Sequence, residues 1–361
     1  MMNTLLFKLK RLVPSFVVMV CIFIALLSPK PIHGQNTPEN ETRIFMLEYE
    51  QGDFWELNAF TGERAMLFSF EPQLGQILDF EVNSERNVIY ILEGAGCCGG
   101  ITAGESRISK MDLDTGIAEI IFSERNLFEI DPVPDPNYLL VSFYDPDLES
   151  ISMAARDGLV EHCLLDLETQ ICTDEFGVSN YNLVGWIGQD HFIGSVRNGS
   201  FQGTSYLIEA ASASTVELPV YMPYWTGIPS TDEILSTTGI GAGSFTRISL
   251  DTLDMASYVI EGIYDSSAQF YPVSFSPNGE HLLFLYEHTY MVAEFPSGEI
   301  VAALSNTFDP QWIDAENLIY SQFAELGTYP GEIRRYNLAS GQDIDLIEFE
   351  ERTQIAVVRH K

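Results

Sequence analysis

Residues 272–286 read PVSFSPNGEHLLFLY, which is a pair of short strands around a Ser-Pro-Asn-Gly turn. A second strand pair, MVAEFPSGEIVAAL, follows at residues 291–304 around a Pro-Ser-Gly turn. Both flanks of each pair are rich in residues that favour strands, and the turn residues supply the geometry that a tight turn needs. Together the two hairpins predict one four-stranded antiparallel unit.

Both hairpins recur along the chain. The 272–286 hairpin has five further counterparts, which alternate with the other type. The turns of the 291–304 type recur every 41 to 54 residues, near Gly62, Gly116, Gln170, Ala213, Asp254, Gly298 and Gly341. A repeat of two hairpins at this period predicts an all-β propeller of four-stranded antiparallel blades.

The two ends of the repeat supply the hairpin that is missing from the count. Residues 43–50 (RIFMLEYE) and 352–360 (RTQIAVVRH) are strand candidates without a neighbour in sequence. Pairing them would complete one more blade and close the ring, which removes exposed sheet edges. We therefore expect a single domain over residues 43–361 with seven blades, six or eight being the alternatives, and a monomer.

The 272–286 hairpin also carries a recognisable motif, an aromatic residue followed by Ser-Pro-Asn-Gly, a charged residue and an apolar strand. This pattern resembles the WD-like repeat of TolB-type propellers. The resemblance is sharp in this unit and degenerate in the others. It implies a fold family whose members often act as interaction domains, and it transfers no catalytic residue.

The first 34 residues have the composition of an export signal. Lys8, Lys10 and Arg11 precede an uncharged run, and a polar stretch follows. We expect cleavage after Gly34, a linker over residues 35–42, and a secreted or periplasmic protein; an uncleaved membrane anchor is the alternative. The chain carries a net charge of −34. Such an acidic surface disfavours nucleic acids and anionic membranes as partners.

Several conspicuous residues become ordinary when the repeats are aligned. A large ring occupies the same place in five hairpins, which predicts packing between blades rather than ligand contact; these residues are Phe80, Trp186, Trp225, Phe275 and Trp312. The run Gly94-Ala95-Gly96-Cys97-Cys98-Gly99 fits a dinucleotide-binding pattern. That pattern needs a helix after its glycines, and a loop and a strand follow here, so we reject a nucleotide site.

The repeats differ most in the connection between the two hairpin types. Long examples cover residues 93–106, 144–161, 197–205, 239–244 and 324–332. Equivalent connections emerge on one face of a propeller, and loops on a rigid scaffold often carry function. We expect the binding site there, at the mouth of the central channel, with these candidate ligand-binding residues: Cys97, Cys98, Tyr144, Asp145, Asp147, Phe201 and Tyr329.

The body of the protein contains four cysteines, an even number that suggests disulfides in an exported chain. Cys163 and Cys172 flank one hairpin, which favours a structural cross-strand bond. Cys97 and Cys98 are adjacent in a glycine-rich loop, which favours a strained vicinal bond. Separate bonds from this pair to distant cysteines are the alternative.

The sequence favours a non-catalytic module that binds an extracytoplasmic protein or glycan. The alternative is a propeller enzyme, lactonase-like or active on glycans, with carboxylates or a divalent cation at the channel mouth. Asp145 and Asp147, with Asp131 and Asp135 nearby, could supply acid and base or hold a metal. We expect no cofactor, Ca²⁺ at Asp145 and Asp147 being the alternative. An assembly role in the envelope is a third hypothesis.

Overall fold

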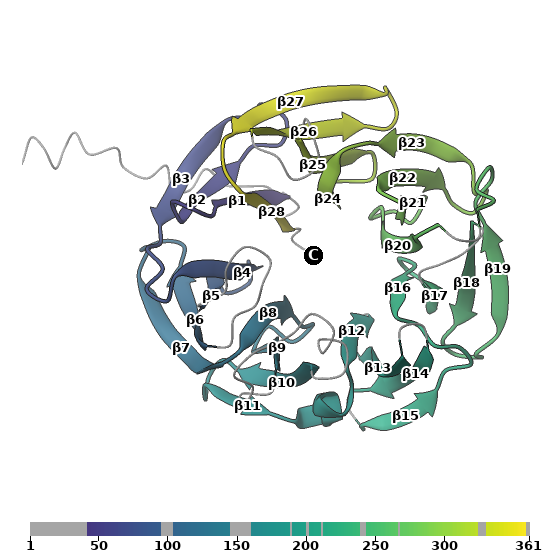
Figure 1. The fold of residues 1–361 in the computed structure, drawn as a ribbon, viewed down its shortest axis with the longest axis horizontal. Helices are drawn as coiled ribbons and strands as arrows, with labels where there is room; N and C mark the ends of the chain where they lie inside the picture. The colour runs from purple at the N-terminus through teal and green to yellow at the C-terminus, as the bar shows by residue number, and fades with distance from the viewer. Residues whose placement is uncertain are drawn as a thin grey trace, which may run out of the picture. The chain divides into compact units, whose positions relative to one another are not determined.

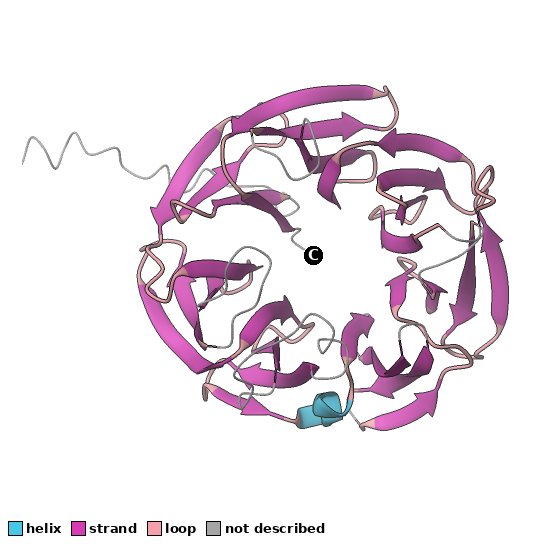
Figure 2. Ribbon diagram, in the orientation of Figure 1, coloured by secondary structure: helices cyan, strands magenta, loops and turns pink. Residues whose placement is uncertain are grey.

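The computed structural model describes residues 42–94, 104–144, 160–187, 190–199, 202–210, 212–238, 243–265, 268–323 and 330–358. These residues form seven four-stranded antiparallel sheets around a common axis, a seven-bladed β-propeller (Figure 1). The predicted fold class and blade number are confirmed. Strands make up almost all of the ring, and the described part contains one short 3₁₀ helix, η2 (Glu175–Asn180), as Figure 2 shows.

Each blade runs from an inner strand beside the axis to an outer strand at the rim (Figure 1). Three blades, each from inner to outer strand, are β4 (Gln76–Asn83), β5 (Val88–Gly94), β6 (Glu105–Asp112) and β7 (Ala118–Arg125); β8 (Leu127–Pro132), β9 (Tyr138–Tyr144), β10 (Val160–Asp166) and β11 (Ile171–Thr173); and β12 (Leu183–Ile187), β13 (His191–Gly199), β14 (Gln202–Glu209) and β15 (Ser214–Glu217). Three more are β16 (Tyr224–Gly227), β17 (Glu233–Thr237), β18 (Ser244–Ser249) and β19 (Met255–Val259); β20 (Phe270–Phe275), β21 (His281–Tyr286), β22 (Thr289–Glu294) and β23 (Ile300–Leu304); and β24 (Thr307–Trp312), β25 (Asn317–Phe323), β26 (Gly331–Asn337) and β27 (Gln342–Phe349).

The seventh blade joins the two ends of the repeat. Its strands are β28 (Thr353–Val358), β1 (Arg43–Glu48), β2 (Asp53–Leu57) and β3 (Arg64–Ser69). β28 is the inner strand and pairs antiparallel with β1, so that Met46 lies opposite Ile355. The predicted pairing of the two terminal strands is confirmed, and it closes the ring by completing the seventh blade.

The turn between the third and fourth strand repeats in all seven blades. One residue in each turn has a positive φ, and its N–H donates to the carbonyl oxygen four residues earlier over 2.8–2.9 Å. These residues are Gly62, Gly116, Gln170, Ala213, Leu253, Gly298 and Gly341, so the fifth turn is centred one residue before the predicted position. Acidic residues often open these turns: the Asp112 carboxylate accepts the Thr115 N–H at 2.8 Å. That contact assigns Asp112 to turn chemistry.

Replacing the glycine with alanine in two of these turns should lower the stability of the protein by unequal amounts. Gly341 has a φ of 66° and no heavy atom within 4 Å of an added Cβ, so Gly341→Ala adds backbone strain alone. We expect it to lower the free energy of unfolding by about 1 kcal/mol. Gly298→Ala should cost clearly more, because its Cβ would collide with the Val259 carbonyl oxygen. Urea titrations check the order, and equal losses for the two variants would contradict it.

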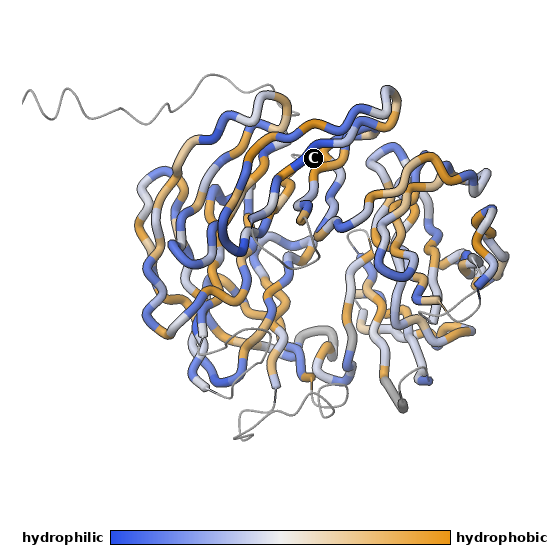
Figure 3. The backbone as a smooth tube through the Cα atoms, turned by 45° about the horizontal axis from the view of Figure 1, so that its top comes forward, coloured by the Kyte–Doolittle hydropathy of each residue, from blue (hydrophilic) through white to orange (hydrophobic). Residues whose placement is uncertain are grey.

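The hydrophobic core is divided into seven clusters, and each cluster lies between two neighbouring blades. Apolar and polar residues alternate along many strands, so one set of side chains meets the next blade (Figure 3). A blade therefore gains its stability from its two neighbours. This arrangement explains why the ring must close to be stable.

The five large rings singled out in the sequence lie on five inner strands and pack into these clusters, as predicted. Trp312 and Phe80 are each 1% exposed. Trp225 lies against Gly185 of the preceding blade, where a Cβ would stand 2.6 Å from the indole ring. The glycine thus makes room for the ring, and Trp225 is a packing residue.

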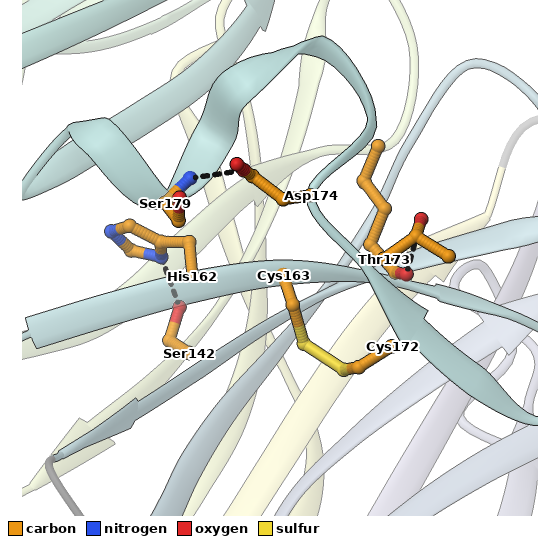
Figure 4. The surroundings of a disulfide bond; sticks show 8 residues. Ser142, His162, Cys163, Cys172, Thr173, Asp174 and Ser179 are labelled. Carbon is orange, nitrogen blue, oxygen red and sulfur yellow. Dashed lines mark hydrogen bonds between the residues drawn. A yellow bond between two sulfur atoms is a disulfide. The ribbon is translucent and has the colours of Figure 1, made fainter.

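Cys163 of β10 and Cys172 of β11 form the predicted disulfide, with a Cα–Cα distance of 5.6 Å (Figure 4). Cys172 lies opposite Leu165, so the two cysteines are diagonal neighbours on one face of the sheet. Next to the bond, the buried His162 ring lies 3.0 Å from the Ser142 hydroxyl. The bond ties the short outer strand to its blade, which is the structural role expected of it.

Candidate functional site

A cavity of about 610 Å³ lies where the inner strands of four blades begin. Its lining comes from the first halves of β4, β8, β24 and β28, from the start of β22, from the end of β25, and from the residues after β1 and before β28. These residues are Tyr49, Leu78, Asp79, Phe128, Glu129, Tyr290, Phe308, Asp309, Phe323, Arg352, Thr353 and Gln354. These inner strands surround the axis in Figure 1. We call this space the channel-mouth cavity. It opens on the face that the sequence assigned to the long connections, because β5, β9 and β25 end there.

Four carboxylates form one wall of the channel. Asp79 and Glu81 alternate along β4, and Glu129 and Asp131 alternate along β8, so each pair points to the same side of its strand. The two inner strands are held together by the Asp79 carboxylate, which accepts the Ile130 N–H at 3.1 Å. Asp79 and Glu129 line the cavity, and the other two lie one step deeper. We call these four residues the acidic wall.

The acidic wall holds its protons more tightly than ordinary carboxyl groups. Burial raises the pKa of Asp79 to about 6, although hydrogen bonds from Ile130 and Phe80 oppose the shift. Burial, and then the charges of Glu129 and Asp79, raise the pKa of Asp131 to about 7. The pKa of Glu81 is raised well above its ordinary value by burial and by the neighbouring carboxylates. Water reaches Glu129, but the enclosing walls and the charge of Asp79 raise its pKa as well.

The junction of β28 and β1, where the two ends of the repeat meet, contributes polar groups to the same cavity. The Arg352 guanidinium lies over the Tyr49 ring, 4.2 Å from its centroid, and its charge favours the ionised form of Asp79. The Tyr49 hydroxyl donates to Gln354, whose amide nitrogen lies 3.4 Å from an Asp79 carboxylate oxygen. Closure of the ring by β28 therefore also completes the cavity.

Aromatic side chains form the apolar part of the cavity. Phe128 stacks on the buried Tyr144 at 4.5 Å between ring centroids, which fixes the Phe128 ring in the lining. Phe308 is 55% exposed and contacts Phe323 edge to face at 6.5 Å. Tyr290 completes this set. The rings add apolar surface to a cavity that the carboxylates also line.

Asp309, on β24, brings a third carboxylate into the cavity. Its φ is +49°, an uncommon value for a residue with a side chain, and it lies where β24 slips in register against β25. Burial raises the pKa of Asp309, and the Gln311 amide, 3.0 Å away, opposes the shift. The same amide donates to the Ile355 carbonyl oxygen at 2.6 Å, which ties β24 to β28.

The cavity lies on the face where the sequence analysis expected the binding site, and that location stays a prediction. Tyr144 is 4% exposed and supports Phe128 without lining the cavity. Asp131, proposed as an acid or base, belongs to the acidic wall. Asp135 is exposed in the β8–β9 turn, where its carboxylate accepts the Asn137 N–H at 2.9 Å, and it does not line the cavity. The other candidates lie outside the described residues: Cys97, Cys98, Asp145, Asp147, Phe201 and Tyr329. Among the described residues, no group of His, Cys, Asp or Glu side chains is arranged to hold a metal ion.

Comparisons with known proteins support the fold. No protein-family model and no curated protein matches the sequence. A proposed 6-phosphogluconolactonase of Bacteroides uniformis superimposes with a TM-score of 0.56 at 9% identity, over 88% of this chain and 100% of that one. The periplasmic gluconolactonase of Pseudomonas aeruginosa gives 0.54 at 11% identity, over 87% and 98%. A prolyl endopeptidase gives 0.56 at 14% identity, over 90% of this chain and half of its own.

These identities show a shared propeller architecture and leave the activity to be argued from the site. The seven-bladed fold is confirmed, and membership of the TolB-type superfamily stays a prediction. Within the described ranges, no helix has the length and apolar character to span a membrane.

Proposed function

We propose that this protein is an exported binding module that takes a glycan in the channel-mouth cavity. The observation that carries the proposal is the pairing of flat aromatic faces with carboxylates in one cavity of about 610 Å³. That volume lies within the usual range for small-molecule sites, which is about 300–1,000 Å³. Aromatic faces pack against the C–H faces of sugars, and carboxylates accept hydrogen bonds from hydroxyl groups.

The chain's charge supports a ligand that is not a polyanion. A net charge of −34 repels phosphate-rich and sulfate-rich partners. The acidic wall adds local negative charge at the binding point. A neutral or basic glycan meets no such barrier, and the N-terminal segment, with the composition of an export signal, supports an encounter outside the cytoplasm.

A calorimetric titration with neutral oligosaccharides of several linkages tests the proposal. We expect at least one to bind the wild-type protein, and Phe308→Ala to weaken that affinity about tenfold, because the loss of an aromatic face costs about 1–2 kcal/mol. Phe60→Ala is the matched control: Phe60 is 58% exposed but lies in the β2–β3 turn on the opposite face. Equal effects of the two variants would contradict the assignment of the site.

Glycan or lactone hydrolysis is the second candidate, and the raised pKa values of Asp79 and Asp131 favour it. A carboxyl group with a pKa near the working pH can donate and accept a proton, as a general acid or base must. Release of reducing ends or opening of a lactone, lost in Asp131→Asn, would establish catalysis. Binding without turnover would leave the protein a binding module.

A further inference from the structure

Among the described residues, the lining of the channel-mouth cavity has more acidic than basic side chains. Three carboxylates line it, and Arg352 is the one basic residue among its described lining. The acidic wall adds two more carboxylates below. The strongest influences on Glu81, besides burial, are three other carboxylates and one backbone N–H, that of Val82. The wall is thus complementary to a positive charge.

The basic residues of the described chain are engaged elsewhere. Their ion pairs join carboxylates outside the cavity, for example Arg43 with Glu56 at 2.6 Å and Arg334 with Asp345 at 2.6 Å. Arg352 itself stacks on Tyr49 at the rim. Among the described residues, no ion pair reaches the acidic wall, which leaves its carboxylates open to a cation carried by the ligand.

The aromatic part of the cavity is suited to the same kind of ligand. Phe308, Phe323 and Tyr290 present ring faces, and ring faces attract organic cations as well as the C–H faces of sugars. A small metal ion would use neither the rings nor the volume. An organic cation attached to a sugar ring would use the carboxylates, the rings and the space at once.

We infer that the glycan bound in the channel-mouth cavity carries free, protonated amino groups, as in an oligomer of glucosamine. This inference rests on the proposed function and names its ligand class. The ammonium group lies at Asp79 and Glu129, and the sugar ring lies against Phe308. Asp309 adds a carboxyl group on the β24 side of the cavity.

Ionisation of the wall then makes binding depend on pH. Asp79 must be charged to hold the ammonium group, and its pKa of about 6 means that the charged fraction rises about tenfold between pH 5 and pH 7. Affinity for an amino glycan should therefore rise up to about tenfold over that interval while the amine stays protonated. Asp309 of β24, Tyr290 of β22 and Arg352, the residue before β28, face the same cavity.

Calorimetry with three probes tests the inference: a β-linked glucosamine tetramer, its N-acetylated counterpart and spermidine. At pH 7 we expect the tetramer to bind at least about tenfold more tightly than either of the others. Glu129→Gln should remove that preference over the N-acetylated tetramer. Glu168→Gln, which removes the same charge from an exposed turn of the same blade, should leave it unchanged.

The outcomes separate the inference from the proposed function. Equal affinity for the two tetramers would overturn the inference and keep glycan binding. Spermidine binding as tightly as the glucosamine tetramer would also overturn it, because the sugar would then contribute nothing. Failure of these tetramers and of every neutral oligosaccharide to bind would overturn the proposed function itself.

Discussion

Replacing Glu93 with glutamine should lower the free energy of unfolding by about 3 kcal/mol. Glu93 ends β5 and has a fully buried side chain, while that of Arg107 is 13% exposed; their ion pair measures 2.6 Å. The second carboxylate oxygen accepts the N–H groups of Gln73 and Leu74 at 2.6 and 3.1 Å. Glutamine would leave the charge of Arg107 in a largely buried place without an anionic partner. It would also weaken the hydrogen bonds from the N–H groups of Gln73 and Leu74, which lie in the segment that leads into β4.

A urea titration of Glu93→Gln measures this loss, and Glu119→Gln is its control. Glu119 pairs with Lys110 at 3.0 Å, but its side chain is 59% exposed, so the change should stay within about 0.5 kcal/mol. Adding Arg107→Gln to Glu93→Gln should cost less than the sum of the single changes, because no unpaired charge remains. A Glu93→Gln loss as small as that of the control would show that the pair does not anchor this part of the blade.

The second large effect is expected at Trp312. Its ring is 1% exposed and fills the cluster between the blades of β20–β23 and β24–β27, beside Leu283 and Tyr320. Trp312→Ala should lower the free energy of unfolding by about 3–5 kcal/mol, because it removes buried apolar surface and leaves a cavity between blades. Loss of this contact should weaken the whole ring, since each blade depends on its neighbours.

Thermal and urea unfolding of Trp312→Ala test that expectation, with Met255→Ala as the control. Met255 is 53% exposed on the outer strand β19, so its truncation should change stability by less than about 0.5 kcal/mol. A Trp312→Ala protein that unfolds like the wild type would mean that the rings shared by the repeats do not hold the blades together.

The fold could be predicted from the sequence because the same pattern of two hairpins recurs along the chain. Hairpin turns with the same backbone geometry recur in every blade, and chance cannot produce seven of them in register. The closure by 43–50 and 352–360 followed from counting hairpins, since an unmatched strand at each end must find a partner. The inner-strand rings could be assigned to packing for the same reason, because a position that recurs in five units does not mark one ligand.

The residues of the cavity were harder to predict because they become neighbours only when the ring closes. Tyr49 and Gln354 are 305 positions apart in sequence, and Asp79 and Gln354 are 275 apart. One signal was present: LDFEV and FEIDP place acids at alternate positions on two consecutive inner strands, where the other repeats do not show this pattern. Acids at alternate positions of an inner strand share one side of that strand beside the channel, whereas the long connections place their residues only at its rim.

The crystal structure of the protein grown with the glucosamine tetramer would test the central claim most directly. We predict ligand density in the channel-mouth cavity, with an amino group beside Asp79 and Glu129 and a sugar ring against Phe308. Density on the opposite face, or between the outer strands at the rim, would contradict the placement of the site. An empty cavity at a ligand concentration that saturates the protein in solution would contradict it equally.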